Sequence, residues 1–357
     1  MSPLDAEDLR ARVQKALNDH LSRQARRLED VSPDLGAVME CITDLVSGGK
    51  RLRPAFCYWA WRGAGAPDDE HIVAASAALE LFQAAALLHD DVMDGSDTRR
   101  GLPATHRRMA NLHRGNGWVG DGERFGTSAA VLAGDLCLSW SDEMLSQSGL
   151  DPVTLTRGRA VFDLMRTQLM GGQFLDVLEQ VLPESDGGGT VERARRVIWF
   201  KSAKYTVEHP LMLGGALAGA APELLASYSA YGLPLGEAFQ LRDDVLGVFG
   251  DPAETGKPAG DDLREGKRTV LIALALRNAS TGEAAAVRQR LGDPHLDAEG
   301  VATLREVIVS TGALDAVEQQ IGTLVLQAHE ALAASVVEEP ARQVLSDLVH
   351  AATARHA

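Results

Sequence analysis

Three aspartates gather at the end of a long apolar segment, where they could bind a divalent cation. The segment Ala74–Leu88 is mostly alanine and leucine, which are strong helix formers, and it is apolar almost all round, as a buried helix is. It leads into the stretch His89–Asp94, which reads HDDVMD, and there Asp90 and Asp94 are four residues apart and so share one helix face. Carboxylates at the end of a buried helix need their charge compensated, and Mg²⁺ prefers such oxygen ligands while keeping coordination positions open for phosphates. Taken alone, however, an Asp-Asp-x-x-Asp motif is also typical of a solvated acidic helix end.

A second acidic pair favours the metal interpretation. Asp243 and Asp244 lie in the apolar stretch Phe239–Leu246, which again predicts a helix that delivers paired carboxylates. Basic residues follow each acidic motif in the chain, namely Arg99, Arg100, Lys257, Lys267 and Arg268. Two acidic pairs that are each followed by cations suit a polyanion held by metal ions on one side and by basic side chains on the other.

The composition is that of an ordinary globular protein and argues against two kinds of partner. Of the 357 residues 45% are hydrophobic, which is enough for a large core. The net charge of −15 argues against nucleic acid, and no uninterrupted apolar run reaches the ~18 residues that a membrane span needs. Cys41, Cys57 and Cys137 are far apart, so we expect buried free thiols. Because residues 1–15 are charged and lack an apolar signal core, we expect the protein to stay in the cytoplasm.

The elements that position these residues are predicted to be helices. Asp5–Leu28 has apolar residues at helical spacing, and alternating strand patterns are nearly absent, which predicts an all-α bundle in one domain over residues 1–357. The glycine-rich and charged stretch Asn111–Gly126 predicts a long surface loop. Gly171-Gly172 predicts close helix packing or a kink, and Pro210 predicts a break or bend.

Several motifs, taken in chain order, resemble those of the trans-isoprenyl diphosphate synthases, the polyprenyl synthetase family that includes bacterial geranylgeranyl and farnesyl diphosphate synthases. Gly48–Pro54 is similar to their isopentenyl-diphosphate signature, and Asp90–Asp94 with Arg99-Arg100-Gly101 is similar to their first aspartate-rich motif. Lys201-Ser202 resembles their Lys-Thr/Ser pair, and Gln240–Lys257 resembles their second acidic motif. The resemblance implies an isoprenoid-synthase-type helical bundle with a central substrate cavity, and a homodimer.

The reaction that the resemblance implies is a Mg²⁺-dependent head-to-tail prenyl transfer. An allylic diphosphate ionises, isopentenyl diphosphate attacks the carbocation, and a proton is lost to the released diphosphate, so the chain grows by five carbons. Diphosphate leaves readily only if its growing charge is neutralised as the C–O bond stretches. Metal ions and fixed cations aimed at that charge are therefore the main catalytic groups.

The family's residue roles carry over to the matching positions. Three Mg²⁺ ions are expected, two on Asp90 and Asp94 with Asp91 nearby, and a third on Asp243 with Asp244 in support. The expected contacts of the allylic diphosphate are Arg99, Lys201 and Lys257. Those of isopentenyl diphosphate are Lys50, Arg53 and Arg100, with Gln83 beside them. Ser202 and Gln240 are expected to offer oxygen dipoles to the carbocation, and Asp261 and Lys267 to belong to a closing flap.

Two positions depart from the family pattern. Gly247 stands where the third aspartate of the second motif is usual, so the third metal ion is expected to depend on Asp243 and Asp244 alone. Gln83 stands where many relatives have histidine, which is a mild change because both side chains can donate a hydrogen bond.

Product length is expected to be set on the helix that carries the first motif. Ala85 and Ala86 lie about one turn below Asp90, and Phe82 lies two turns below it, roughly 12 Å along a helix that rises 1.5 Å per residue. Family members with shorter products often carry an aromatic residue in place of these alanines, so the growing chain is expected to pass farnesyl length and to stop at Phe82. We therefore predict geranylgeranyl diphosphate as the product, with farnesyl or longer diphosphates as alternatives. The opposite wall, around Ala129–Leu138, could change this length.

Two rival functions share parts of this pattern. A non-catalytic subunit of a heteromeric prenyl synthase usually loses one acidic motif, whereas both are largely present here. A terpene cyclase shares the helical fold and a first acidic motif, but it would not need the basic loop Gly48–Pro54.

Overall fold

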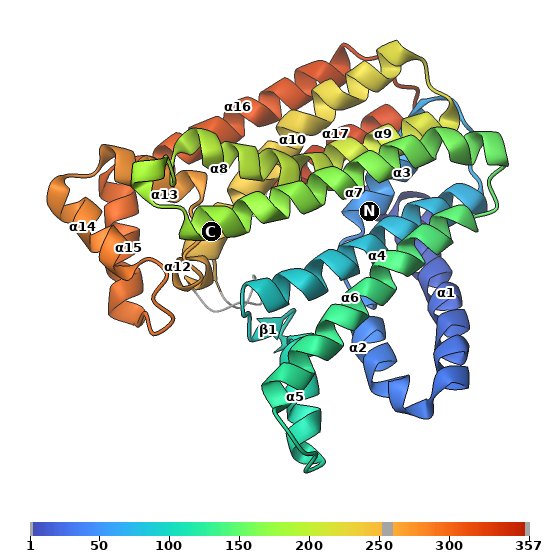
Figure 1. Cartoon of the computed structure of the whole chain (residues 1–357). Helices are drawn as coiled ribbons and strands as arrows, with labels where there is room; N and C mark the ends of the chain where they lie inside the picture. Colours follow the sequence, from blue (N-terminus) through green and yellow to red (C-terminus); the bar gives the residue numbers. More distant parts are fainter. Residues whose placement is uncertain (1–2, 252–259, 354–357) are drawn as a thin grey trace. The chain divides into compact units, whose positions relative to one another are not determined.

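The described part of the chain is almost entirely helical, as the sequence predicts (Figure 1). The computed structural model describes residues 3–251 and 260–353. The β-structure within these residues is a single two-stranded sheet. Residue contacts divide the chain into two compact units, and the expectation of one domain over residues 1–357 stays a prediction.

The first unit comprises residues 1–159 and 213–220. Its elements are η1 (Pro3–Asp8), α1 (Leu9–Val31), η2 (Pro33–Leu35), α2 (Gly36–Val46), α3 (Leu52–Gly63), α4 (Glu70–Met93), β1 (Thr98–Arg99), β2 (Leu102–Pro103), α5 (Thr105–Gly115) and α6 (Gly122–Ser146), with the start of α7 (Pro152–Val181) and the end of α9 (His209–Ala218).

The second unit comprises residues 160–212 and 221–357. It holds the rest of α7, the start of α9, and η3 (Glu184–Asp186), α8 (Val191–Val197), the π-helix η4 (Ile198–Glu208), α10 (Pro222–Phe249), α12 (Asp261–Arg264), α13 (Val270–Asn278), α14 (Thr281–Arg290), α15 (Ala298–Ser310), α16 (Ala313–Ala333) and α17 (Ala341–Thr353).

Helix α4 is the core helix of the first unit. It packs against α1, α3 and above all α6, which runs beside it in Figure 1. Within the described residues α4 is the one helix that is long and apolar enough to cross a membrane, but 72% of its most apolar window is buried inside the structure. That burial is typical of a core helix, and it explains why the sequence is apolar on every face.

Two predictions for the first unit are confirmed. The amphipathic N-terminal segment forms α1, which buries the expected stripe of Leu9, Val13, Leu17 and Leu21. The three cysteines are free thiols and all are buried, namely Cys41, Cys57 and Cys137.

The prediction of a long loop at Asn111–Gly126 is wrong. Helix α5 continues to Gly115, and α6 begins at Gly122 because Asp121 caps it, accepting hydrogen bonds from the backbone of the next residues. Gly126 belongs to a tight helix contact, since a Cβ there would lie 2.1 Å from the carbonyl oxygen of His106 on α5. Glycine here permits close packing rather than a loop.

A short hairpin that the sequence did not predict follows the first acidic motif. Thr98–Arg99 pairs antiparallel with Leu102–Pro103. The two turn residues, Arg100 and Gly101, both have positive φ, +53° and +76°, which is the pattern of a type I′ turn. Arginine rarely occupies this left-handed region, so its sequence gives no ordinary hairpin signal.

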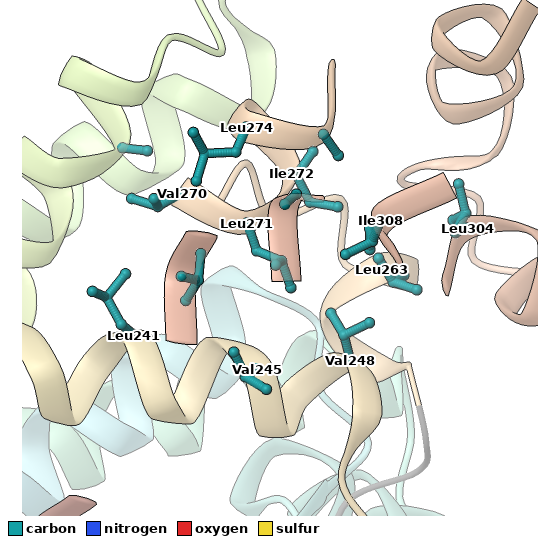
Figure 2. Close-up of a cluster of buried hydrophobic side chains, with 14 of the residues drawn as sticks. Leu241, Val245, Val248, Leu263, Val270, Leu271, Ile272, Leu274, Leu304 and Ile308 are labelled. Atoms are coloured by element: carbon teal, nitrogen blue, oxygen red, sulfur yellow. The ribbon is translucent and has the colours of Figure 1, made fainter. Parts of the chain in front are cut away.

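The core of the second unit forms around one face of α10. Leu241, Val245 and Val248 of α10 point toward Leu271 of α13 and Leu263 of α12 (Figure 2). These positions on α10 recur every three to four residues, as expected for one buried helix face. The same helix carries the second acidic motif, so this core fixes the position of that motif within its unit.

Candidate active site

The first acidic motif lies at the C-terminal end of α4, where negative charge is unfavourable. Gly95 adopts a positive φ of +67° and ends the helix, so Asp90 and Asp91 lie in its last turn and Asp94 is its C-cap. The C-terminus of a helix carries a partial negative charge, and the last turn of α4 contains no basic residue. Three carboxylates in this position favour a cation beside them.

Arg99 turns back from the hairpin to one of the three carboxylates. Its Nε donates a 2.9 Å hydrogen bond to Asp91 Oδ1, and its Nη2 contacts the same oxygen. The Nη2 atom lies 3.8 Å from Asp90 Oδ2. Asp91 is buried and Asp90 is half-buried, while Asp94 is half-buried as a residue but has both carboxylate oxygens shielded from solvent. Arg99 thus pairs with Asp91 and also lies within ion-pair distance of Asp90.

A buried arginine fastens the basic loop between α2 and α3. Arg51 has a left-handed backbone and is only 5% exposed, and its guanidinium donates to the Glu80 carboxylate of α4 and to the Val46 carbonyl. With Arg51 held inside, Lys50 on one side is exposed and Arg53 on the other is half-buried. Sequence reasoning did not single out Arg51 or Glu80. Glu80 is a charged residue within an otherwise apolar helical segment, and such a residue needs a partner. That is the signal that could have revealed the pair.

Arg100 joins the hairpin to this basic loop. Its Nη1 donates to the carbonyl oxygens of Leu45, at 2.7 Å, and Gly48, at 2.9 Å. Loss of solvation lowers the pKa of Arg100, and nearby cations lower it further, namely Arg51, Arg99 and Arg53. Three of the expected diphosphate-binding cations, Arg53, Arg99 and Arg100, thus lie near one another within the first unit. Their mutual repulsion favours binding of a polyanion.

His89 packs against α6 rather than joining the acidic motif. Its Nε2 lies 3.2 Å from the Val131 carbonyl and 3.5 Å from Asp135 Oδ1. A Cβ at Gly134 would lie 2.2 Å from the same nitrogen, so the imidazole occupies the space above this glycine. His89 is therefore a packed histidine with a backbone hydrogen-bond partner. The segment Ala129–Leu138, expected to form the opposite wall, belongs to α6, which packs against α4.

The residues expected to govern product length lie on α4, toward its N-terminus from the acidic motif. Phe82 and Ala85 are each 2% exposed, and Ala86 is half-buried. Gln83, also half-buried, lies seven residues before Asp90 and so on the same helix face.

In the second unit, glycines bring two helices against the π-helix that carries Lys201 and Ser202. A Cβ at Gly172 of α7 would lie 2.4 Å from the Lys201 backbone nitrogen, and one at Gly236 of α10 would lie 2.5 Å from the Ala203 carbonyl oxygen. The close-packing prediction at Gly172 is therefore confirmed. The π-helix ends just before Pro210, which cannot donate a backbone hydrogen bond, and an α-helix follows. Runs of π-helix are rare and are frequently found at functional sites.

Asp176 is a residue of this site that sequence reasoning missed. Its Oδ2 accepts from Lys201 Nζ at 2.6 Å, and both side chains are largely buried. Asp176 lies four residues after Gly172 on α7, so the same face that approaches the π-helix delivers this carboxylate. An aspartate one helical turn after the Gly171-Gly172 pair is the sequence signal that could have revealed this residue.

The second acidic motif contains a carboxylate whose charge burial disfavours. Asp244 is 6% exposed, and burial raises its pKa to about 8. The charges of Asp262 and Asp243 contribute to this rise, while a 2.8 Å hydrogen bond from Gln240 Nε2 opposes it. With its N–H donated to Asp244, the Gln240 amide can present its carbonyl oxygen to a cation.

The segment after the second motif brings a lysine back to the acidic residues. Lys267 Nζ lies 2.5 Å from Glu265 and 3.6 Å from Asp262, in the segment that follows α12. Asp261 begins α12. Lys257, the remaining expected diphosphate contact, lies outside the described residues.

The donor set in both units fits Mg²⁺. No three acidic, histidine or cysteine side chains of the described residues lie close enough to form a complete metal site. Mg²⁺ is commonly held by one or two carboxylates, with phosphate and water completing its octahedron. Carboxylates at the negative end of α4, and the buried Asp244 on α10 whose charge is disfavoured, are donors that such an ion would stabilise.

Comparison with known proteins identifies the family. The sequence pattern of the polyprenyl synthetase family matches residues 36–308. The chain belongs to the polyprenyl synthetase family. As a member, it is a trans-prenyltransferase that makes prenyl diphosphates, and the prediction of an enzyme of this class is confirmed.

A solved structure has the same fold as this polyprenyl synthetase over nearly the whole length of both chains. It is a geranylgeranyl pyrophosphate synthase from Corynebacterium glutamicum complexed with isoprenyl diphosphate and magnesium. It is 42% identical, with a TM-score of 0.91, and the match covers 96% of this chain and 98% of that one. The isoprenoid-synthase-type fold is confirmed.

Curated relatives of this polyprenyl synthetase make products of several lengths. The geranylfarnesyl diphosphate synthase of Aeropyrum pernix is 30% identical over 308 residues, covering 85% of this chain and 89% of that one. The octaprenyl diphosphate synthase of Escherichia coli is 31% identical over 331 residues, covering 92% and 93%. Family membership therefore does not determine the product length.

Proposed function

We propose that this polyprenyl synthetase condenses isopentenyl diphosphate with allylic diphosphates in a Mg²⁺-dependent head-to-tail reaction and makes geranylgeranyl diphosphate. The observation that carries the proposal is the 42% identity to a geranylgeranyl pyrophosphate synthase that was solved with isoprenyl diphosphate and magnesium. The acidic and basic motifs described above supply the side chains that this chemistry requires.

The first unit is proposed to hold the diphosphates by its carboxylates and cations. Asp90 and Asp94 would bind Mg²⁺, and Arg99, already hydrogen-bonded to Asp91, would face the allylic diphosphate. When bound, Mg²⁺ neutralises the charge that develops on the leaving diphosphate. The cations proposed for isopentenyl diphosphate are Lys50, Arg53 and Arg100, with Gln83 beside them.

The second unit is proposed to supply the remaining charges. Asp243, supported by Asp244, would bind a third Mg²⁺ ion. Lys201 would contact the allylic diphosphate, and its ion pair with Asp176 holds the ammonium in a fixed place. Ser202 and Gln240 would direct oxygen dipoles toward the carbocation, in keeping with the amide orientation that the Gln240–Asp244 hydrogen bond imposes. Lys257 would also contact the allylic diphosphate, and Asp261 and Lys267 would belong to a segment that closes over the substrates.

Incubation of the purified protein with Mg²⁺, isopentenyl diphosphate and each allylic primer tests this function. Accumulation of the C20 diphosphate is the expected result. Farnesyl or longer diphosphates would keep the enzyme class and reject the product length. Hydrocarbons would indicate a cyclase, and a lack of turnover that a partner protein restores would indicate a subunit of a heteromeric synthase.

Product length is proposed to depend on Phe82. This side chain is 2% exposed on α4, two turns from Asp90, whereas Ala85 and Ala86 between them are small. Phe82→Ala should therefore shift the main product beyond C20, as seen by chromatography of the dephosphorylated alcohols. Phe56→Ala, on α3 and likewise buried, is a control for simple loss of core packing. An unchanged product in Phe82→Ala would show that another residue stops the chain.

A homodimer in the cytoplasm is also proposed. The three buried free thiols suit a reducing compartment. Light scattering of the purified protein should give twice the chain mass of 38.1 kDa, and a mass equal to one chain would reject the dimer.

A further inference from the structure

Gly247 leaves a space on α10 that a carboxylate from another element fills. A Cβ built at Gly247 would lie 1.9 Å from Asp262 Oδ2 and 2.6 Å from Asp262 Cγ. No side chain at position 247 could coexist with this arrangement. Gly247 lies four residues after Asp243, so it shares a helix face with the residue expected to bind the third metal ion.

Asp262 is held in this place by packing and by its own backbone. The next residue, Leu263, is 1% exposed and packs beside Val248 of α10 (Figure 2). The Asp262 carbonyl accepts a 3.0 Å hydrogen bond from the backbone of Lys267.

We propose that Asp262 replaces the carboxylate that the second acidic motif lacks at Gly247, and that it takes part in binding the metal ion at Asp243. The motif is thereby completed from α12 instead of from α10. The proposal differs from the expectation that Asp243 and Asp244 alone hold the third ion. The inference rests on the proposed function, because it requires a divalent ion at the second motif.

Asp262 could also act by holding Lys267 in place, and the experiment must separate this role from metal binding. Its carboxylate lies 3.6 Å from Lys267 Nζ, so its loss could act only by displacing that lysine. Glu265 lies on the same segment and pairs with the same lysine at 2.5 Å. Glu265→Gln removes one negative charge and one Lys267 contact without touching the space at Gly247, and is therefore the matched control.

The test is Mn²⁺ binding by electron paramagnetic resonance, with and without inorganic pyrophosphate. Asp262→Asn should weaken one class of Mn²⁺ site about tenfold or more, the range seen when groups that support a metal site are removed. Glu265→Gln should bind Mn²⁺ as the unaltered protein does. The double substitution Gly247→Asp with Asp262→Gly should regain the affinity, because it moves the carboxylate back to α10. Circular dichroism checks that each variant is folded.

The outcomes separate the two proposals. If the unaltered protein binds Mn²⁺ and Asp262→Asn binds it equally well, Asp262 is no part of the metal site although the proposed function stands. Equal weakening in Glu265→Gln would assign the effect to Lys267 and also reject the inference. If the unaltered protein binds no Mn²⁺ even with pyrophosphate, the proposed function fails and the inference fails with it.

Discussion

At the scale of single residues, the site is defined by carboxylates in unfavourable electrostatic surroundings. Asp90 lies in the last turn of α4, and Asp244 is buried beside two other acids. Such placements cost stability in the unliganded protein, and a bound cation offsets this cost. The same physics explains why Asp91, which Arg99 already neutralises, is expected to matter less for metal binding.

Asp90→Asn should lower kcat/KM by on the order of 10² or more, because removing one preorganised charge contact costs about that much. Product formation at saturating Mg²⁺ is the measurement. Asp97→Asn is the control, since Asp97 lies on the same stretch, is exposed and pairs with Arg107. A comparable loss in both variants would show that local negative charge, and not metal binding, is what the first motif supplies.

The buried His20 should make the stability of the protein depend on pH. Burial, together with the neighbouring charge of Arg23, lowers the pKa of His20 to about 4. An unfolded histidine titrates near its ordinary pKa of ~6.5, so between these values the unfolded state binds more protons than the folded one. Stability is therefore lost as the pH falls from about 6.5 to about 4.

The contribution of His20 is isolated by comparing the unaltered protein with His20→Gln. The unfolding free energy should fall by ~3 kcal/mol more between pH 7 and pH 4 in the unaltered protein, which follows from the size of the shift. Urea denaturation at each pH measures it. Parallel pH profiles for the two proteins would contradict the prediction.

At the scale of elements, glycines decide how closely the site-bearing helices approach one another. Gly172 of α7 and Gly236 of α10 both face the π-helix that carries Lys201. Each would place a Cβ within about 2.5 Å of backbone atoms, which cannot move without shifting the helix. The position of Lys201 is thus set by the absence of two side chains.

Gly172→Ala and Gly171→Ala form a matched pair that tests this packing. A Cβ at Gly172 would meet the Lys201 backbone, whereas a Cβ at Gly171 has nothing within 4 Å. Gly172→Ala should destabilise the fold by ~1–3 kcal/mol and lower kcat, because overpacking displaces the π-helix. Gly171→Ala should be neutral or stabilising by up to ~1 kcal/mol, since alanine is the better helix former. Denaturation and activity assays compare them, and equal effects would contradict the account.

At the scale of the whole molecule, metal and diphosphate should stabilise the folded chain. Ligands that bind only the folded state raise its stability in proportion to the logarithm of their concentration, by ~2.7 kcal/mol at a hundred times Kd. Mg²⁺ with inorganic pyrophosphate should therefore raise the melting temperature by several degrees, and a chelator should abolish both this shift and the activity. Mg²⁺ or pyrophosphate alone should give smaller shifts. A melting temperature that does not respond to the pair would contradict a metal-bridged diphosphate site.

The sequence by itself determined the fold class and the chemistry. Alanine and leucine without alternation required helices, and the apolar run before Asp90 required a buried one. Acidic and basic residues in the family's order indicated diphosphate chemistry. These features depend on local composition and on spacing along one helix, which a sequence displays directly.

Only the tertiary structure decided which residues from different elements meet. The glycines of Asn111–Gly126 suggested a loop, but one of them packs against a neighbouring helix. Asp176 beside Lys201, Arg51 beside Glu80 and Asp262 in the space at Gly247 are contacts between elements. The residues of each pair are 15 to 29 positions apart, as their numbers show, and helical periodicity carries no information about such pairs. They arise because helices pack where side chains leave room, which is a property of the folded chain.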